Sequence, residues 1–457
     1  MKVEASSFRD NSGFVFYDQG EIFRAITYLY KDNYDHLIKS GLYNYLVEEK
    51  LLIPHSEEMS SDKIDSNIYK VIKPEKIDFI TYPFEWCFSQ LKDAALTTLK
   101  IQKATLKYGM TLKDSSAYNI QFYLGRPILI DTLSFEIYTE GEPWQAYNQF
   151  CKHFLAPLAL AAIYDVRLYL MLKNFIDGIP LNLAKKIIGK KAFLKLGVFV
   201  HIYLHSKFQV RYSDKNESLS VKKKWMNKEA LLRLIGNLET TVNKLKIKKN
   251  KTAWSNYYFY EYHTKTYLEE KKEIVKTYID KIKPKRVLDV GANDGEFSKI
   301  AAASSKVVLA LDSDHYCVEE CYNYTKKNNI QNLIPIVADL TNPSPFIGWA
   351  NSERLSLLKR SNAELVLALA IIHHLCISNN IPFDLLADFF DKTGEWLIIE
   401  FIPKSDPMVK KLLLHRKDIF ENYNVEIFEK EFLKYFSIIE YKKVSDTERT
   451  IYLMRKN

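Results

Sequence analysis

The sequence predicts an α/β protein with more than one domain, and three observations support this class. From residue 285 onward, apolar runs typical of buried strands alternate with helical segments, as in a parallel sheet covered by helices on both faces. Before residue 212, short strand-like runs are mixed with long helical stretches, which predicts a separate α+β domain. The 457 residues also exceed the size that one hydrophobic core usually supports.

Composition and charge exclude several other classes of protein. Apolar residues make up 47% and charged residues 26% of the chain, which argues against a disordered chain and against a coiled coil. The net charge of +9 is mild for this length, and the lysine runs at 222–224 and 244–251 lack interleaved aromatic side chains. Nucleic acid is therefore not an expected partner.

The chain is expected to be cytoplasmic and without a membrane span. Its five cysteines form no Cys-x-x-Cys pair, and their odd number speaks against a disulfide framework. The first residues lack the apolar core of a signal peptide, and no stretch of about 20 uncharged apolar residues occurs. The stretch 154–176 is the most apolar candidate, but Asp165, Arg167 and Lys173 interrupt it, which favours a buried helix.

Residues 1–211 are expected to form the first domain. The run FVFYDQGEIFRAI contains two alternating segments around an Asp-Gln-Gly turn, which predicts a hairpin. The spacing of apolar residues predicts a helix over 85–109, ending at a glycine. The runs NIQFYL and PILIDTL, joined through Gly125, predict a second hairpin, and residues 144–210 again have helical spacing.

Residues 212–256 are rich in Lys, Asn and Ser and are predicted to form a linker with a helical insert. The second domain would then span 257–457 and begin with an amphipathic helix over 257–283. Strands are predicted at RVLDVG, VVLALD, LIPIVA, AELVLALA and WLIIEF, and helices at GEFSKIAAAS, YCVEECYNYTKK and FDLLADFF. Two final strand-like runs predict an antiparallel hairpin at the sheet edge.

The clearest motif is VLDVGANDGEF, which places Asp289, Gly291 and Gly295 at the carboxyl end of the first strand of this domain. Glycines let a ligand approach the backbone where a Cβ would clash, and ligands of open α/β sheets bind at this edge. The Gly-x-Gly-x-x-Gly pattern of dinucleotide enzymes is absent, as is the Lys-Ser/Thr of a P-loop. A nicotinamide cofactor is therefore disfavoured.

The ordered set of motifs over about residues 260–457 resembles the class I S-adenosylmethionine-dependent methyltransferases. Asp289, Gly291 and Gly295 match the first motif of that family, with Asn293 in place of the commoner middle glycine. LVLALAIIHHL resembles the fourth motif, and the terminal hairpin resembles the family's sixth and seventh strands.

The resemblance implies S-adenosylmethionine as cofactor. It places Asp312 where the family's acid accepts hydrogen bonds from both ribose hydroxyls, and Asp339 where a side chain contacts the adenine amino group. The alternative is a Rossmann-like fold that binds another nucleoside or nothing, because many functions share such folds.

Candidate catalytic residues follow the fourth and fifth strands. Methyl transfer mainly requires alignment of nucleophile and methyl group, and a hydroxyl or amine acceptor also needs a base. His373 and His374 lie past the fourth strand, and a neutral imidazole suits that role, although one could pack in the core and the other face solvent. Glu400 ends the fifth strand and could be a base or orient a histidine. No metal site is expected.

The N-terminal half carries a second set of polar residues. Asp114, Asn119 and Asp131 resemble the catalytic loop of protein kinases and aminoglycoside phosphotransferases. The resemblance implies that Asp114 takes the substrate's proton while Asn119 and Asp131 hold Mg²⁺. Leu112-Lys113 replaces the usual residues before Asp114, Arg24 lies near the place of the expected lysine, and no glycine-rich loop occurs, so Mg-ATP is possible but not favoured. Ordinary turn and cap roles are the alternative.

The whole chain, through GMTLKDSSAYN, IDTLSFE and EFIPK, looks like large bacterial methyltransferases related to host-specific nodulation proteins. The sequence therefore predicts a methyltransferase whose partly kinase-like N-terminal domain recognises an unidentified acceptor, for which a glycan and a small molecule are the candidates. A bifunctional kinase and methyltransferase is one alternative, and a catalytically dead binding scaffold is another. The oligomeric state is not predicted.

Overall fold

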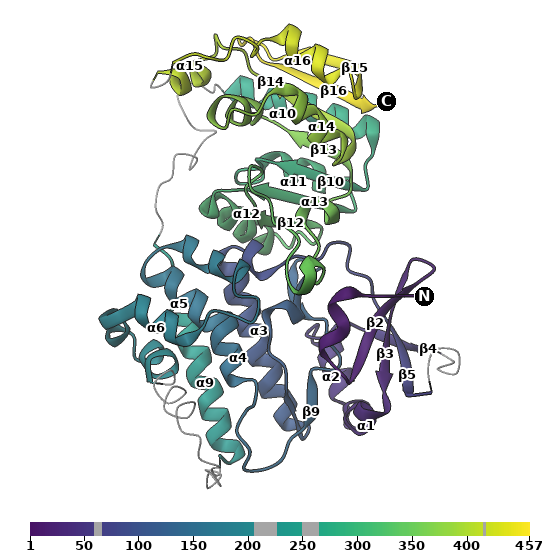
Figure 1. Ribbon diagram of the computed structural model, residues 1–457, viewed down its shortest axis with the longest axis vertical. Coiled ribbons are helices and arrows are strands. Elements are labelled where there is room, and N and C mark those ends of the chain that lie inside the picture. Colours follow the sequence, from purple (N-terminus) through teal and green to yellow (C-terminus); the bar gives the residue numbers. More distant parts are fainter. Residues whose placement is uncertain (59–65, 205–225, 249–264, 415–416) are drawn as a thin grey trace. The chain divides into compact units, whose positions relative to one another are not determined.

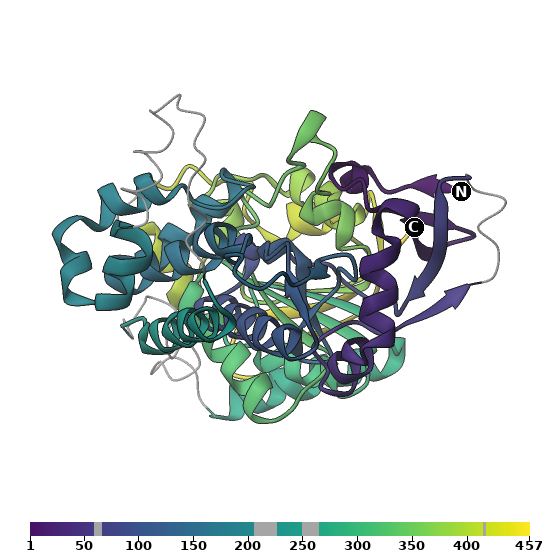
Figure 2. The same ribbon diagram turned by 90° about the horizontal axis from the view of Figure 1, so that it is seen from below.

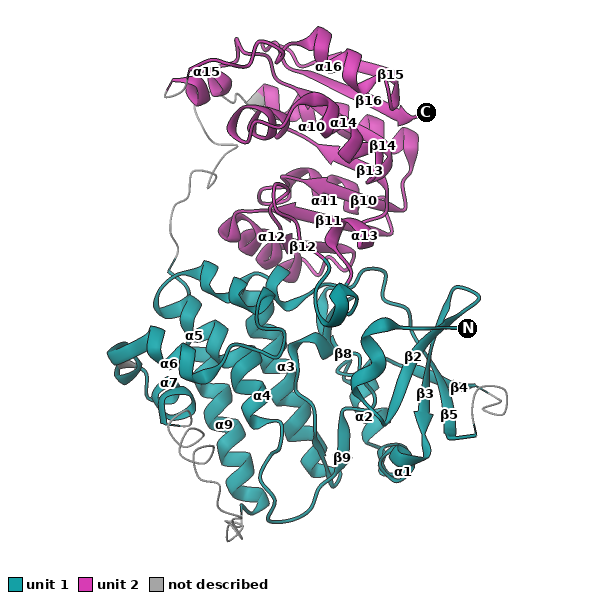
Figure 3. Cartoon of the chain, in the orientation of Figure 1, with its two compact units in different colours: residues 1–248, 346–354 teal, residues 249–345, 355–457 magenta. Residues whose placement is uncertain are grey.

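The computed structural model divides into two compact units, which are coloured separately in Figure 3. Unit 1 comprises residues 1–248 and 346–354, and unit 2 comprises residues 249–345 and 355–457. The residues that the structure describes are 1–58, 66–204, 226–248, 265–414 and 417–457.

Unit 1 begins with a five-stranded antiparallel sheet and two helices (Figure 1). The elements are β1 (Lys2–Val3), η1 (Ala5–Arg9), β2 (Gly13–Asp18), β3 (Glu21–Thr27), η2 (Tyr28–Tyr30), α1 (Lys31–Lys39), α2 (Leu42–Glu48), β4 (His55–Glu58) and β5 (Ile68–Pro74). The sheet order is β1-β2-β3-β5-β4. The first predicted hairpin is confirmed as β2 and β3, and Gln19 and Gly20 both have positive φ, as the tight turn of a two-residue hairpin requires.

The rest of unit 1 is mainly helical and contains two short strand pairs. Its elements are η3 (Pro83–Glu85), α3 (Phe88–Lys107), β6 (Met110–Leu112), η4 (Ala117–Asn119), β7 (Ile120–Tyr123), β8 (Arg126–Leu129), β9 (Phe135–Ile137), α4 (Tyr147–Phe150), η5 (Cys151–Leu155), α5 (Ala156–Ile163), η6 (Val166–Lys173), α6 (Leu181–Ile188), η7 (Gly189–Leu194), α7 (Leu196–Val198), η8 (Phe199–Leu204) and α9 (Lys228–Lys244). Strands β6 and β9 pair, and β7 pairs with β8. The predicted helix over 85–109 is confirmed as α3, and the second hairpin as β7 and β8.

The sequence analysis expected one buried helix over the apolar stretch 154–176, but the structure divides this stretch. It divides into α5 and η6 at Tyr164, because the Asp165 carboxylate caps η6 by accepting a hydrogen bond from the Arg167 amide at 2.9 Å. Among the described residues, none of the helices combines the length and apolar character that a bilayer crossing requires.

The boundary between the two units differs from the prediction, which placed a linker at residues 212–256. Residues 212–225 and 249–256 lie outside the described residues, but the helical insert is α9, which lies beside α3 (Figures 1 and 2). Its apolar face is fully buried at Leu231, Ile235 and Leu238. The side chains of α3 also bind it, since Lys92 donates to the carbonyl of Asn243 at 2.9 Å and Lys103 pairs with Glu239. Helix α9 is therefore part of unit 1.

A second difference concerns residues 346–354, which the sequence analysis placed in the second domain. They belong to unit 1, where Arg9 donates to the Glu353 carboxylate at 2.7 Å. The guanidinium of Arg354 lies over the ring of Tyr118, 4.6 Å from its centroid.

Unit 2 contains a seven-stranded sheet with the order β12-β11-β10-β13-β14-β16-β15. Its elements are α10 (Lys265–Ile282), β10 (Arg286–Val290), α11 (Glu296–Ala302), β11 (Val307–Asp312), α12 (His315–Lys327), β12 (Leu333–Val337), α13 (Leu357–Arg360), β13 (Ala363–Ala368), η11 (His374–Ser378), α14 (Phe383–Asp391), β14 (Gly394–Phe401), α15 (Pro407–Leu413), α16 (Val425–Phe432), β15 (Phe436–Lys443) and β16 (Thr450–Lys456), while η10 (Trp349–Asn351) belongs to unit 1.

The five predicted strands are confirmed, and they are parallel to their neighbours from β12 through β14. The predicted terminal hairpin is confirmed as β15 and β16, which join the sheet antiparallel to β14. The first five strands follow the Rossmann order, which reverses between β10 and β13. Ligands of such sheets bind at this switch point, outside the carboxyl ends of the strands.

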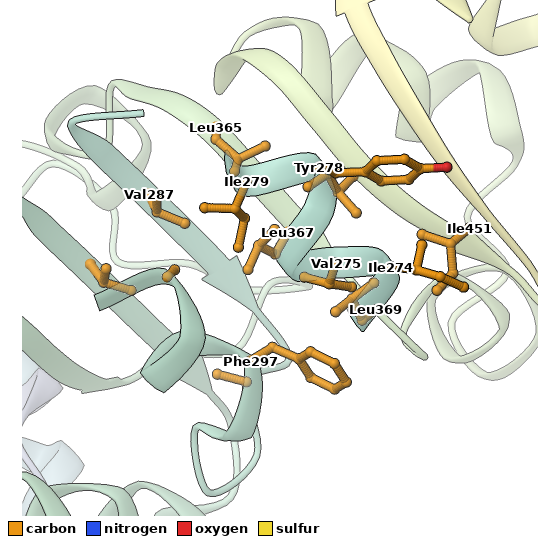
Figure 4. Packing of buried hydrophobic residues seen from close by; sticks show 14 of the residues in the cluster. Ile274, Val275, Tyr278, Ile279, Val287, Phe297, Leu365, Leu367, Leu369 and Ile451 are labelled. Carbon is orange, nitrogen blue, oxygen red and sulfur yellow. The ribbon is translucent and has the colours of Figure 1, made fainter. Parts of the chain in front are cut away.

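Helix α10 covers the sheet beside that switch point, as Figure 4 shows. Val275 and Tyr278 of α10 are fully buried with Leu365 and Leu367 of β13 and with Ile451 of β16. This apolar packing joins α10 to the central strand β13 and to the terminal hairpin of β15 and β16.

Candidate active site

The loop after β10 is held close to its neighbours by two glycines with positive φ. A Cβ at Gly291 (φ 74°) would lie 2.6 Å from Cδ1 of Ile371, and one at Gly295 (φ 84°) would lie 2.6 Å from Sγ of Cys321. The Gly291 amide donates to the carbonyl of Leu311, at the end of β11. The loop, called the glycine cradle below, is therefore packed closely against Ile371 and Cys321 at the switch point, and side chains at the two glycine positions would clash with them.

Asp312 ends β11 beside this cradle. Its carboxylate accepts hydrogen bonds from the amides of Asn293 and Asp314, each at 2.8 Å. Burial raises the pKa of Asp312 to about 6, although these two amide bonds favour the charged form. The Ser313 amide also contributes to holding the charged form, and a carboxylate has about four lone-pair sites, so capacity remains for a further donor.

Asp289 lies beneath the cradle in β10 and is buried. Its Oδ2 accepts a hydrogen bond from the Ser298 hydroxyl at 2.5 Å. Burial raises the pKa of Asp289 to about 7, and the charge of Asp312 adds to the rise, while Ser298 and Lys271 lower it. Asp289 therefore lies within the sheet, where its carboxyl group interacts with the charge of Asp312 and accepts a hydrogen bond from Ser298.

Asp339 lies two residues beyond the end of β12. It is exposed, and its Oδ1 accepts hydrogen bonds from the amide and the hydroxyl of Thr341 at 2.8 and 2.7 Å. The amide of the preceding Ala338 donates to the carbonyl of Asp312. The backbone places Asp339 at the edge of the site, while its side chain stabilises its own turn.

His373 and His374 follow β13, at the opposite side of the switch point. Their ring centroids lie 4.0 Å apart. His373 is fully buried, and neither of its ring nitrogens has a hydrogen-bond partner among the described residues. Burial lowers the pKa of His373 well below its usual value and that of His374 to about 4, so both imidazoles are neutral at pH 7.

Glu400 of β14 is fully buried and engages both of its oxygens. Oε2 accepts from Lys271 Nζ at 2.6 Å and from the amide of Ala370 at 2.7 Å, while Oε1 accepts from the Tyr267 hydroxyl at 3.2 Å. Burial opposes ionisation of Glu400, but the nearby charges of Lys271 and Arg449 outweigh it, so the pKa of Glu400 lies below its usual value.

Two further charged residues complete the buried network around Glu400. Arg449 forms a two-point ion pair with Asp406, at 2.8 and 3.1 Å, and donates to the Tyr267 hydroxyl at 2.8 Å.

The sequence analysis missed Lys271 and Arg449. For Lys271 a signal existed, because it falls on the apolar stripe of α10 between Tyr267 and Ile274, where a solvated lysine would not be placed.

Unit 1 brings together Asp114, Asn119 and Asp131, the other predicted group. The Asn119 amide donates to the Ser134 hydroxyl at 3.3 Å, and that hydroxyl donates to Oδ2 of Asp131 at 2.7 Å. Asp114 accepts from the Ser116 amide at 2.8 Å. Burial raises the pKa of Asp114, and the neighbouring charge of Asp131 contributes.

The carboxylate of Asp131 is already paired with a cation. Arg24 of β3 approaches its Oδ1 to 2.7 Å, and both side chains are 14% exposed. The same oxygen accepts from the Leu133 amide at 3.0 Å. Within the described parts of the chain, no cluster of three or more His, Cys, Asp or Glu side chains is placed to hold a metal ion.

The strand order and the glycine cradle of unit 2 define a class I methyltransferase fold, with five strands in Rossmann order and an antiparallel terminal hairpin. The whole chain is 30% identical to nodulation protein NoeA of Rhizobium meliloti strain 1021 over 459 aligned residues, which cover 99% of this chain and 96% of that protein. The chain therefore belongs to the NoeA family, and the predicted resemblance to nodulation proteins is confirmed. No family model matches the chain.

Solved structures show more distant similarity. The N-methyltransferase NodS from Bradyrhizobium japonicum WM9, in complex with S-adenosyl-L-homocysteine, is 12% identical, with a TM-score of 0.32 over 42% of this chain and 87% of that chain. Magnesium protoporphyrin IX methyltransferase from Synechocystis PCC 6803, also with S-adenosyl-L-homocysteine bound, is 16% identical, with a TM-score of 0.32 over 45% and 93%. The bifunctional kinase-methyltransferase WbdD is 14% identical, with a TM-score of 0.30 over 41% and 39%.

Proposed function

We propose that unit 2 transfers the methyl group of S-adenosylmethionine to an acceptor that unit 1 helps to recognise. The observation that carries this proposal is the placement of Asp312 beside the glycine cradle at the switch point of the sheet. The acceptor is not identified by the structure, and a glycan or a small molecule with a hydroxyl or amine group fits the proposal.

The residues present fit the cofactor. The Asp312 carboxylate keeps capacity to accept a hydrogen bond from a ribose hydroxyl, and the Asn293 amide of the loop donates to it, so the carboxylate and the loop backbone lie together at the switch point. Asp339 would lie toward the adenine through its backbone position. The cofactor supplies an electrophilic methyl group, and the chain supplies binding, alignment and exclusion of water.

His373 is the better candidate for a base, and Glu400 the better candidate for a positioning role. A base needs a lone pair that is not already engaged, and both ring nitrogens of His373 are free of hydrogen bonds to the described residues. Burial holds its pKa well below the usual value, so the ring is neutral but is weakened as a base. Glu400 has both oxygens engaged and a lowered pKa. The ionised carboxylate of Glu400 is therefore held by the ion pair and hydrogen bonds that it makes with Lys271, Tyr267 and the Ala370 amide.

Transfer of a labelled methyl group tests the proposed activity. Incubation of the protein with S-adenosylmethionine carrying a labelled methyl group, in bacterial extracts, is expected to label a molecule that mass spectrometry detects. His373→Gln should retain cofactor binding and lose label, because removal of a general base lowers the rate by about 10²–10⁴. Equal labelling by wild type and by an enzyme-free extract would contradict the activity.

Affinity for the cofactor product should depend on pH through Asp312. Hydrogen bonds from ribose hydroxyls favour the ionised carboxylate, whose pKa is about 6 in the free protein. Affinity for S-adenosylhomocysteine should therefore be constant above about pH 7 and fall by up to about tenfold by pH 5, as Asp312 takes up a proton. Asp312→Asn should bind more weakly and with a flatter profile. A profile that is equally steep in both proteins would remove this role from Asp312.

The order of elements in unit 1 supports a kinase-like fold. In protein kinases a strand bearing a lysine precedes the catalytic loop with its Asp and Asn, and a metal-binding Asp comes later. Here β3 carries Arg24, the loop between β6 and β7 carries Asp114 and Asn119, and Asp131 follows the hairpin of β7 and β8. The Mg²⁺ ion does not fit the described contacts, because Arg24 and the Leu133 amide hold Oδ1 of Asp131. We therefore propose recognition rather than phosphotransfer for this unit.

Wild-type protein is accordingly expected to give no binding signal with Mg-ATP in isothermal titration, at concentrations up to about 1 mM. The reason is that an arginine already neutralises the carboxylate that would bind the metal. Arg24→Ala should expose Asp131 and serves as the matched variant. Micromolar affinity for Mg-ATP in the wild type, lost in Asp131→Ala, would instead support the bifunctional alternative.

A further inference from the structure

The turn between β13 and η11 has an unusual backbone that a buried carboxylate holds. Ala370 has φ 51°, in the left-handed region that is unfavourable for a residue with a side chain. Its amide donates to Oε2 of Glu400 at 2.7 Å. A side chain from another strand therefore holds a backbone conformation that alanine does not favour on its own.

The same turn contacts both sides of the candidate site. The residue after Ala370 is Ile371, whose side chain lies where a Cβ on Gly291 would be, so the turn lies against the glycine cradle. Two residues further is His373, with its unpartnered and buried ring. A shift of Ala370 would therefore move the wall of the cradle and the candidate base together.

Lys271 balances the charge of the carboxylate that holds this turn. Its Nζ lies 2.6 Å from Oε2 of Glu400, the oxygen that also accepts from Ala370. The two side chains are 2% and 0% exposed. Oε1 of Glu400 is held separately, by the Tyr267 hydroxyl at 3.2 Å, so the carboxylate is held at both oxygens.

We infer that Glu400 is a positioning residue that holds the turn at Ala370, and through it the cradle wall at Ile371 and the imidazole of His373, while Lys271 balances its buried charge. The positioning rests on the described contacts alone, and its importance for methyl transfer rests on the proposed function. Buried ion pairs are often no more stabilising than apolar residues of similar volume, so stability alone does not account for the pair.

A pair of double variants separates positioning from simple charge pairing. Lys271→Met with Glu400→Gln and Lys271→Met with Glu400→Leu both remove the two charges and keep similar volumes. Glutamine still accepts a hydrogen bond from the Ala370 amide, and leucine does not. If the pair only balances charge, the two double variants should behave alike.

Hydrogen exchange at the Ala370 amide is the direct readout. Exchange should be at least about tenfold faster in the leucine variant than in the glutamine variant, because the amide there loses its acceptor. The His373 signal of ¹³C-labelled histidine, assigned with His373→Gln, should shift in the leucine variant and stay near its wild-type position in the glutamine variant. Equal exchange rates and equal His373 signals in the two variants would overturn the inference.

A measurement on the wild type keeps the inference testable if the leucine variant does not fold. The Ala370 amide lies outside the strands, so local opening would normally release it quickly. We expect it to exchange within about tenfold of the rate of the buried β13 amides. Exchange at the rate of an exposed loop amide would overturn the inference.

Titration with S-adenosylhomocysteine distinguishes the failure of this inference from that of the proposed function. The glutamine variant should retain cofactor affinity within about threefold, and the leucine variant should lose at least about tenfold. If the wild type itself does not bind the molecule, the proposed function fails, while the exchange measurements still decide whether Glu400 holds the turn. Equal affinities in both double variants, with a binding wild type, would count against the inference.

Discussion

Lys271→Met alone is expected to lower the free energy of unfolding by up to about 3–5 kcal/mol, because it removes the closer cation from the buried Glu400 carboxylate and leaves only Arg449, 3.8 Å away. The sign of the pH dependence follows from the same contact. In the wild type the pKa of Glu400 is lowered, so its ionised form adds stability above its unfolded pKa. In the variant, loss of Lys271 raises the pKa of Glu400. The difference in free energy of unfolding between wild type and variant should therefore shrink as the pH falls toward 4. Chemical denaturation at pH 8 and at pH 4 measures both effects.

Two control variants accompany this prediction. Lys271→Met with Glu400→Gln removes both charges and should recover most of the lost stability, since no uncompensated charge stays buried. Lys434→Met removes a lysine from the exposed pair with Glu431 and should leave the unfolding midpoint unchanged. An equal loss in the single and double variants would show that the lysine acts through packing rather than charge.

Gly291→Val is expected to abolish cofactor binding at concentrations that saturate the wild type. Gly291 has φ 74°, which a β-branched residue rarely adopts, and its Cβ would lie 2.6 Å from Ile371. The loop or Ile371 must therefore shift, which changes the position of the loop relative to Asp312 at the end of β11. Isothermal titration with S-adenosylhomocysteine measures the loss.

Gly236→Val is the control for that change. It adds the same side chain to α9, where no atom outside the helix and the neighbouring residues lies within 4 Å of the new Cβ. It should keep wild-type affinity. Full affinity in Gly291→Val, with circular dichroism unchanged, would mean that the cofactor binds elsewhere.

The sequence was sufficient for the sheet of unit 2 because each parallel strand there is a short apolar run between turn signals. Asp289, Gly291 and Asp312 could be placed for the same reason, since the carboxyl ends of parallel strands meet at one edge. The helix α9 was assigned to a linker because lysine-rich segments flank it, and its buried face became visible only through its contacts with α3.

The polar contacts of the site could not be predicted. Lys271 and Glu400 are 129 residues apart, and nothing local in either segment indicates that they meet. The pairing of Arg24 with Asp131 is likewise a property of the folded chain. Arg24 and Asp131 were both singled out from the sequence. The conclusion that Asp131 does not bind Mg²⁺ follows only from the 2.7 Å distance between the two side chains.

The central claim is that Asp312 and the glycine cradle bind S-adenosylmethionine. Isothermal titration of S-adenosylmethionine into the wild type and into Asp312→Ala tests it most directly. Charge-assisted hydrogen bonds contribute roughly 1.5–3 kcal/mol each, so we predict saturable binding by the wild type and affinity at least about tenfold weaker in a folded Asp312→Ala. The same dissociation constant in both proteins, or no binding by the wild type, would contradict the account.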